Sequence, residues 1–296
     1  MIAVTGGAGA MGTRLCKKLL SEGLAVRVLD LDKPGTRNRM HRLGVEFRPA
    51  DVADPLSLGG ALEGCDAVVH LAGQVLAQGN TALLDRVNRQ GTENVLAEAA
   101  KSGATRFVHI SSISVSYRLA NPYSESKRLA ELAVQASPLD WTILRPTLAW
   151  GSPSCAEHEA FRLAVGSRRI LPFPGGGTAR KAPVHVDDLA DAFASTLRCN
   201  GSIGRILALS GSRTVSLREM AQEIQALQGR QARILPIPSW IAATASRVLP
   251  PLARAAGIKP PGDWQTYTGL VEDACPSWRE AGDLLDWHPR GWKADS

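Results

Sequence analysis

The architecture is best deduced from Thr5-Gly6-Gly7-Ala8-Gly9-Ala10-Met11-Gly12, which directly follows a short apolar run from Met1 to Val4. An apolar run that ends in glycines and continues into leucines at helical spacing predicts a strand, a tight turn and a helix. Gly6 and Gly7 permit the turn, Gly9 lets the backbone approach a phosphate, and Gly12 lets the helix pack closely on the strand. The free N–H groups at such a helix start, here including Ala10 and Met11, bind the pyrophosphate of a dinucleotide.

A second apolar run, 25–29, ends in an acid at the spacing from the glycines that this motif requires, and the acid is Asp30. A glycine cluster alone is equally typical of a surface turn, so the acid distinguishes the two interpretations. A carboxylate there accepts hydrogen bonds from both hydroxyls of the adenosine ribose and repels a 2′-phosphate, which favours NAD over NADP. Three cations of the next loop would contact a 2′-phosphate if the loop folded back, so NADP stays open: Lys33, Arg37 and Arg39.

Composition limits the classes of protein that fit. The chain has 296 residues, of which 44% are hydrophobic and 21% charged, so we expect a globular protein with one large lobe and a smaller dependent one. The net charge of +6 comes from Lys and Arg scattered among 28 acids, and aromatic residues are few. This pattern favours a basic enzyme that attracts anionic ligands over a nucleic-acid-binding protein.

Cysteine and histidine usage predicts neither disulfides nor a metal site. The five cysteines are widely separated and form no C-x-x-C pair, and the six histidines are dispersed. This pattern indicates reduced thiols in a cytoplasmic protein. Because the first strand already begins at the first residues, we expect no signal peptide.

The longest apolar stretch, 240–258, is interrupted by charged and proline residues, so we expect no membrane span. The interruptions are Arg247, Pro250, Pro251 and Arg254. Two alternatives remain for this stretch, a lid over the substrate and a segment lying on a membrane surface, and we favour the lid.

Short apolar runs continue to alternate with helical segments through the first half of the chain. Strands are expected at 45–48, 67–73, 106–110 and 141–146, and helices at 55–62, at 83–102 and from Pro122. This alternation predicts an α/β fold with a Rossmann-type, doubly wound parallel sheet. Ligands collect at the carboxyl ends of the strands in such sheets, where the glycine turn, Asp30, Asp51, Gly73 and Ser112 all fall.

The alternation breaks down after residue 150. We expect 151–182 to be irregular, with a loop at 172–177. Residues 184–188 then lead into a helix that ends at residue 197, and a strand follows at 205–209. The next helix is expected to be capped by Ser216 and Glu219. The remainder reads as helices joined by Pro and Gly. We therefore expect a dinucleotide-binding domain, 1–150, to which 183–210 returns. Residues 151–182 and 211–296 would form a smaller, mostly helical C-terminal lobe that binds a small-molecule substrate.

Three side chains form a constellation suited to moving a hydride to or from an alcohol carbon. Tyr123 and Lys127 are four residues apart and so share a helical face, and Ser112 follows a strand. A phenol has a reference pKa of about 10, so it needs the nearby lysine cation to act as a base at neutral pH. Ser112 would hold the substrate oxygen, and Lys127 could also anchor the nicotinamide ribose. Taken alone, Tyr-x-x-x-Lys is also typical of a surface pair.

Together these motifs resemble the extended, NAD-dependent epimerase/dehydratase branch of the short-chain dehydrogenase/reductase superfamily, over nearly the whole chain. The family's T-G-x-x-G-x-x-G is present at 5–12, and Ser112, Tyr123 and Lys127 fall on its catalytic triad. The resemblance implies a mainly structural role for Asn88. It also implies cofactor contacts, beyond those already named, from Asp51, Val52, Leu71, Ala72, Gly73, Tyr123, Lys127 and Pro146.

The substrate is less well defined by the resemblance. Many such relatives act on nucleotide sugars, and a basic set near Gly175 could bind a diphosphate or could simply be solvated: Arg168, Arg169, Arg180 and Lys181. A nucleotide sugar or related compound is our first expectation. Two spacings, 73–88 and 112–123, are shorter than in those enzymes, and 139–146 also resembles ketone reductases and 3-hydroxysteroid dehydrogenases.

Two alternatives to a nucleotide-sugar enzyme therefore remain. The first is a ketone reductase or 3-hydroxysteroid-type dehydrogenase whose segment 236–261 covers an apolar substrate. The second is a non-catalytic, NAD(P)-binding subunit. Relatives often dimerise through the helices that here are 83–102 and 123–135, so the resemblance leaves a homodimer open.

Overall fold

The centre of the molecule is a parallel sheet of seven strands in the order β11-β6-β5-β4-β1-β2-β3. The computed structural model describes residues 1–75, 80–258 and 262–294. The strands are β1 (Ile2–Thr5), β2 (Val26–Asp30), β3 (Glu46–Pro49), β4 (Ala67–His70), β5 (Arg106–Ile110), β6 (Asp140–Pro146) and β11 (Arg205–Leu209). All neighbouring pairs run parallel. The strand order reverses at β1, which confirms the expected doubly wound α/β fold.

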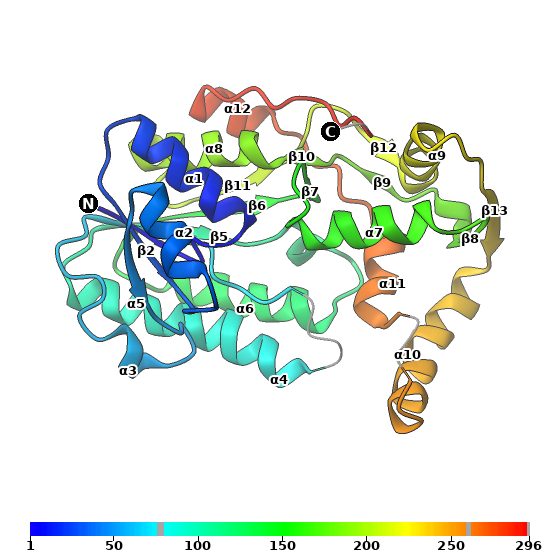
Figure 1. Cartoon of the computed structure of the whole chain (residues 1–296), viewed down its shortest axis with the longest axis horizontal. Coiled ribbons are helices and arrows are strands. Elements are labelled where there is room, and N and C mark those ends of the chain that lie inside the picture. Colours follow the sequence, from blue (N-terminus) through cyan, green and yellow to red (C-terminus); the bar gives the residue numbers. More distant parts are fainter. Residues whose placement is uncertain (76–79, 259–261, 295–296) are drawn as a thin grey trace.

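Helices cover both faces of this sheet (Figure 1). One face carries α1 (Ala10–Ser21), α8 (Val186–Arg198) and α12 (Arg279–Leu285), and the other carries α5 (Gly91–Lys101) and α6 (Pro122–Gln135). Two further helices, α2 (Thr36–Leu43) and α3 (Pro55–Leu58), connect strands. Each face has its own apolar core, one around Leu15, Leu189 and Phe193 and the other around Val95 and Phe107. Strands buried on both faces explain why the sequence shows continuous apolar runs.

Two helices of the first half differ from the expected bounds. The predicted helix 83–102 consists of α4 (Thr81–Leu84), a π-helical turn η1 (Asp85–Gln90) and α5. The predicted helix 55–62 was too long, because α3 ends at Leu58 and is followed by Gly60 at a φ of +68°. Left-handed backbone at a glycine ends a helix, and apolar spacing alone does not record it.

The second half contains more regular structure than the sequence predicted. The segment 151–182 includes α7 (Ala156–Gly166), β8 (Ile170–Pro174) and the 3₁₀ turn η3 (Gly175–Gly177), so its description as irregular was wrong. Pro172 to Pro174, expected in a loop, belong to β8, which pairs in parallel with β13 (Arg233–Ile237). Short strands stabilised by a distant partner give little local signal. Short pairs also join β7 (Ala149–Trp150) to β10 (Val184–His185) and β9 (Arg180–Lys181) to β12 (Val215–Ser216).

The remaining helices are α9 (Leu217–Leu227), α10 (Ser239–Ala255) and α11 (Trp264–Val271). The capping box of Ser216 and Glu219 at the start of α9 is confirmed. Among the described residues, none of the helices combines the length and the apolar composition that crossing a bilayer requires. The two-lobe division stays a prediction.

The end of the chain returns to the central sheet. Leu285 and Trp287 share a core with strand β1 and helix α1. The buried carboxylate of Asp188, in α8, accepts hydrogen bonds from the backbone N–H and the Nε of Arg290, each at 2.8 Å. The backbone carbonyl of Asp188 accepts a third, from Trp287 Nε1 at 2.7 Å. Asp188 therefore helps to hold the C-terminal segment against the sheet.

We expect Asp188→Asn to lower the free energy of unfolding by about 1–3 kcal/mol. The substitution removes the buried negative charge that pairs with Arg290, and the new amide NH₂ group faces an N–H group of Arg290 that has lost its acceptor. Urea denaturation measures the change. Asp187→Asn is the matched control, since Asp187 is exposed and pairs with Arg14 at the surface. It should cost no more than about 1 kcal/mol. Equal losses in the two variants would contradict this role of Asp188.

Candidate functional site

The glycine turn between β1 and α1 has no room for side chains. Gly6 has a φ of +68°, and a Cβ built on it would lie 2.7 Å from the backbone nitrogen of Ala72. A Cβ on Gly12 would lie 2.5 Å from the carbonyl oxygen of Gly6. Gly9 occupies the N-cap of α1 and offers no side chain to its amides, which include those of Ala10 and Met11. The turn therefore presents bare N–H groups at a helix start, the arrangement that fits a pyrophosphate.

Asp30, at the carboxyl end of β2, is held against this turn. Its carboxylate accepts hydrogen bonds from the N–H of Ala8 at 2.9 Å and from that of Leu31 at 2.8 Å. Arg39 also reaches the turn, where it donates to the carbonyl of Ala8 at 2.9 Å. Arg37 instead pairs with Asp32 at 2.8 Å. Of the cations that left NADP open, Arg39 thus lies in the same neighbourhood as Asp30.

The segment after β4 connects the glycine turn to α6. Leu71 and Ala72 lie beside Gly6, and a Cβ on Gly73 would be 3.3 Å from Asn88 Oδ1 and 4.0 Å from Lys127 Nζ. Asn88 is fully buried, and it exchanges hydrogen bonds with the backbone of Gln74 and donates to Ser126 of α6. The structure therefore brings the 71–73 segment and α6 together through Asn88.

Asp51 and Val52 follow β3 at the same edge of the sheet. The carboxylate of Asp51 accepts from the N–H of Ala53 at 2.9 Å. Val52 is buried and its carbonyl accepts from Asn94 at 2.9 Å. Pro146 is buried at the carboxyl end of β6. These residues stand at the strand ends where the sequence predicted them.

Ser112 follows the carboxyl end of β5, and helix α6 carries Tyr123 and Lys127 toward it. The Ser112 hydroxyl accepts a hydrogen bond from the hydroxyl of Ser114 at 2.9 Å, and it lies near enough to Tyr123 to lower the pKa of the phenol. Lys127 is buried, and its Nζ donates to the carbonyl of Ile110 at 2.7 Å. The helix that carries both Tyr123 and Lys127 is fixed at its start by a capping box of Asn121 and Ser124.

A buried ion pair anchors the same helix further along. Glu131 of α6 is bound by two nitrogens of Arg145, at 2.9 and 2.6 Å. Arg145 belongs to β6, so the pair fixes α6 relative to the sheet. A bidentate contact of this kind fixes orientation as well as distance.

Burial controls the protonation of these groups. Burial raises the pKa of Tyr123 above its ordinary value, the carboxylate of Glu157 adds to that, and the nearby hydroxyl of Ser112 opposes it. Burial also lowers the pKa of Lys127 to about 8, against the attraction of Glu131. Near neutral pH the lysine is therefore still largely cationic, and the phenol is protonated. A positive charge brought beside Tyr123 would lower the pKa of its phenol.

The model of the NAD dependent epimerase/dehydratase family matches residues 2–208. This chain belongs to that family. The matched region contains the glycine turn, Asp30 and the Ser112, Tyr123 and Lys127 cluster.

Individual relatives cover most of the chain at low identity. The ceramide reductase of Caulobacter vibrioides is 28% identical over 240 residues, which cover 80% of this chain and 74% of that protein. The UDP-glucose 4-epimerase of Vibrio cholerae is 25% identical over 266 residues, which cover 81% of this chain and 79% of that protein. The dTDP-glucose 4,6-dehydratase of Streptomyces venezuelae, solved with NAD bound, has 23% identity and a TM-score of 0.76, covering 99% and 93%. Family members similar to this chain thus include reductases, epimerases and dehydratases.

A second polar cluster lies near Tyr123, and of its residues only Lys181 was predicted from the sequence. Lys181 Nζ lies 5.5 Å from the ring centre of Tyr117 and donates to the carbonyl of Glu272 at 2.6 Å. Burial lowers the pKa of Lys181 to about 8, with nearby acids that include Glu157 opposing the shift. Lys181 is buried, whereas the three arginines grouped with it by sequence are exposed: Arg168, Arg169 and Arg180. Tyr117, Glu157 and Glu272 were missed because they come from separate segments and match no local motif.

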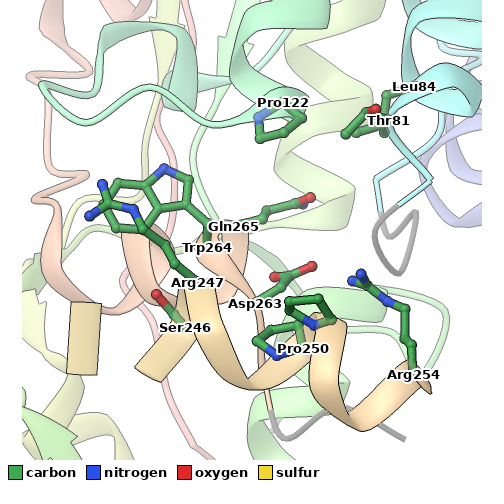
Figure 2. A pocket seen from close by; sticks show the side chains of 11 residues that line it. Thr81, Leu84, Pro122, Ser246, Arg247, Pro250, Arg254, Asp263, Trp264 and Gln265 are labelled. Atoms are coloured by element: carbon green, nitrogen blue, oxygen red, sulfur yellow. The ribbon is translucent and has the colours of Figure 1, made fainter. Parts of the chain in front are cut away.

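A cavity of about 280 Å³ opens beside the start of α6 (Figure 2). Its walls come from α4, α6, α10 and α11, and the lining residues include Leu84, Pro122, Arg247, Pro250 and Trp264. The guanidinium of Arg247 lies 3.7 Å from the centre of the Trp264 ring. Part of the segment expected to cover an apolar substrate, 236–261, therefore lines a cavity at the start of α6. Its residues 259–261 lie outside the described residues.

The low pKa of Lys127 predicts a particular pH dependence of stability. Between about pH 8 and the reference lysine pKa of about 10.4, the unfolded chain binds a proton that the folded chain does not, so stability rises with pH by up to about 3 kcal/mol. Lys127→Met removes this contribution. Urea denaturation across that range should show a shallower rise for the variant than for the wild type.

Lys17→Met, at an exposed lysine of α1, should keep the wild-type pH dependence. Any contribution from Lys181 is present in all three proteins and cancels from the comparison. A Lys127→Met curve parallel to that of the wild type would contradict the shift.

Proposed function

We propose that this chain is an NAD-dependent oxidoreductase that transfers a hydride at a secondary alcohol or ketone carbon, with Tyr123 as its acid and base. The observation that carries the proposal is the approach of Tyr123 to Ser112 at the same edge of the sheet as the glycine turn, where the buried amine of Lys127 also reaches the carbonyl of Ile110. A hydroxyl near a phenol, on a helix that also carries a buried lysine, is an arrangement that can hold a carbonyl oxygen and deliver a proton to it.

We propose that the cofactor binds to residues whose geometry fits a dinucleotide. Gly6, Gly9 and Gly12 leave space for phosphates, Ala10 and Met11 contribute amides, and Asp30 is placed for the adenosine ribose. The residues proposed to complete the cofactor contacts are Asp51, Val52, Leu71, Ala72, Gly73, Tyr123, Lys127 and Pro146. When bound, NAD gives or takes the hydride, and its oxidised form adds a positive charge beside the phenol.

Each side chain of the cluster has one task in this proposal. Tyr123 moves a proton between its phenolic oxygen and the substrate oxygen. Ser112 orients that oxygen by a hydrogen bond. Lys127, whose pKa of about 8 leaves it mostly charged at neutral pH, stabilises the phenolate when the proton leaves.

Tyr123→Phe tests the assignment, because it removes the proton donor and keeps the ring. We expect kcat to fall by about 10²–10⁴-fold while the affinity for NAD, measured by fluorescence quenching or calorimetry, stays unchanged. Tyr267→Phe, at a tyrosine of α11, is the matched control and should keep its turnover. Undiminished turnover of Tyr123→Phe would refute the role of the phenol.

For the substrate, we propose an apolar ketone or the corresponding alcohol. The supporting observation is the cavity beside Pro122, whose walls include Leu84, Pro250 and Trp264. Apolar walls favour an apolar guest, since burying each methylene contributes about 0.8 kcal/mol. The ceramide reductase among the relatives, a protein named for reducing a lipid, is consistent with this substrate class.

A nucleotide sugar, our first expectation from sequence, remains the second candidate. The observation in its favour is Lys181, a buried cation in the cluster that includes Tyr117 and Glu157, because such a cation suits an anionic or hydroxyl-rich ligand. The UDP-glucose 4-epimerase relative is consistent with this class.

Net cofactor turnover distinguishes the two classes. With methyl ketones of increasing chain length, a reductase should oxidise NADH, and kcat/KM should rise about fourfold for each added methylene until the cavity is filled. With UDP-glucose, an epimerase should form product without net NADH change. Product from UDP-glucose and none from the ketones would replace the first candidate by the second. Bound NAD without turnover of either class would favour the non-catalytic subunit.

A further inference from the structure

Helix α10 exposes large apolar side chains on its outer side. Ile241, Val248 and Leu252 lie 42%, 49% and 61% exposed, and their spacing of seven and four residues places them on one helical face. Trp240, at the first turn of the helix, is 72% exposed. Figure 1 shows α10 at the lower edge of the molecule, projecting away from the central sheet. A continuous apolar face of this kind on a projecting helix marks an interaction surface.

The opposite side of α10 is already occupied. Pro250 is buried, and Arg247 stacks on Trp264 of α11. Arg247, Pro250 and Arg254 line the cavity shown in Figure 2. The helix thus has an inner side that forms the cavity wall and an outer, apolar side formed by Ile241, Val248 and Leu252. The outer side is separate from the cavity-lining residues.

The segment that contains this helix carries no acid of its own, and Asp263 lies directly beyond it at the cavity. Residues 224–262 contain five Lys and Arg and no Asp or Glu, although the whole chain has 28 acids. Arg247 and Arg254 fall together on the inner side of the helix, where both are exposed to solvent. An apolar stripe with exposed cations on the other side of the helix, and an aromatic residue at its end, is the composition of helices that lie in the headgroup region of a membrane.

The same charge argues against a second copy of this chain as the occupant. Two identical faces would bring two acid-free, basic segments together, and like charges in an interface are unfavourable. An anionic bilayer offers apolar acyl chains to the stripe and phosphates to the arginines. We propose that α10 docks this protein on an anionic lipid surface, with Ile241, Val248 and Leu252 facing the acyl chains. The inference goes beyond the proposed function and does not depend on it.

This docking would set the cavity next to the membrane. The residues that line the cavity and those that face lipid belong to the same helix, so bound lipid would lie within one helix diameter of Pro250 and Arg254. The protein would lie on the surface without crossing it, in agreement with the interruption of the segment by Pro250 and Pro251.

Vesicle flotation of the chain 1–296 tests the proposal. We expect the wild type to float with phosphatidylcholine vesicles that contain phosphatidylglycerol, to float much less with pure phosphatidylcholine, and to be released by salt. Val248→Ser combined with Leu252→Ser should weaken partition at least about tenfold. The matched control combines Leu56→Ser with Leu163→Ser, two leucines of α3 and α7 that are 89% and 56% exposed. It should float like the wild type.

Four outcomes would overturn the proposal. They are absence of the wild type from the anionic vesicles at low salt, equal flotation with neutral vesicles, equal losses in the two double variants, and a dimer by light scattering that only the α10 variant dissociates. The last outcome would assign the face to a second copy. Thermal unfolding and NAD affinity of both variants should match the wild type, which separates a docking defect from misfolding. Because flotation reads no activity, its failure leaves the proposed function standing.

Discussion

The whole arrangement depends on the absence of side chains where the turn after β1 meets the segment after β4. A Cβ on Gly6 would contact the backbone of Ala72, and one on Gly12 would contact the backbone of Gly6. This contact brings the start of α1 against residues 71–73, and Gly73 in turn lies over Lys127 and Asn88. The proposed pyrophosphate cradle and the helix that carries the proposed acid and base are therefore linked by one series of close contacts, from the backbone of Gly6 and Ala72 to the side chains of Asn88 and Lys127. A change in any of them displaces the others.

The central sheet could be predicted because its physical signals are local. Strands buried on both faces appear as apolar runs, and glycines or acids mark their carboxyl ends. The second half gave weaker signals. Strand β8 contains two prolines and is stabilised by β13, about sixty residues further along the chain, so neither strand shows a pattern of its own. The π-helical turn that buries Asn88 is likewise invisible in apolar spacing, because it changes the helical phase by one residue.

The residues of the candidate site also fall into two groups, those that a local motif reveals and those that only the tertiary fold brings together. Residues within short motifs, such as Asp30 and the pair Tyr123 and Lys127, were found because one strand or one helix fixes their spacing. Glu157 and Glu272 were not, because only the tertiary fold brings α7 and the segment after α11 toward Tyr117. Lys181 was placed with three arginines on the basis of charge, and the structure separates it from them by burial. Sequence reasoning thus identified a chemistry more readily than a substrate.

The fastening of the C-terminal segment at Asp188 has a consequence for how the molecule is made. Asp188 and Arg290 are 102 residues apart in the sequence. During translation the Asp188 carboxylate therefore has no hydrogen-bond donor from Arg290 until well after the strands of the sheet, including β11, have been synthesised. An aspartate without its partners would stay hydrated and keep α8 from packing fully against the sheet. The contacts of Asp188 would then form only after Trp287 and Arg290 are synthesised, and a nascent chain cut before them would leave α8 incompletely packed and open to proteolysis.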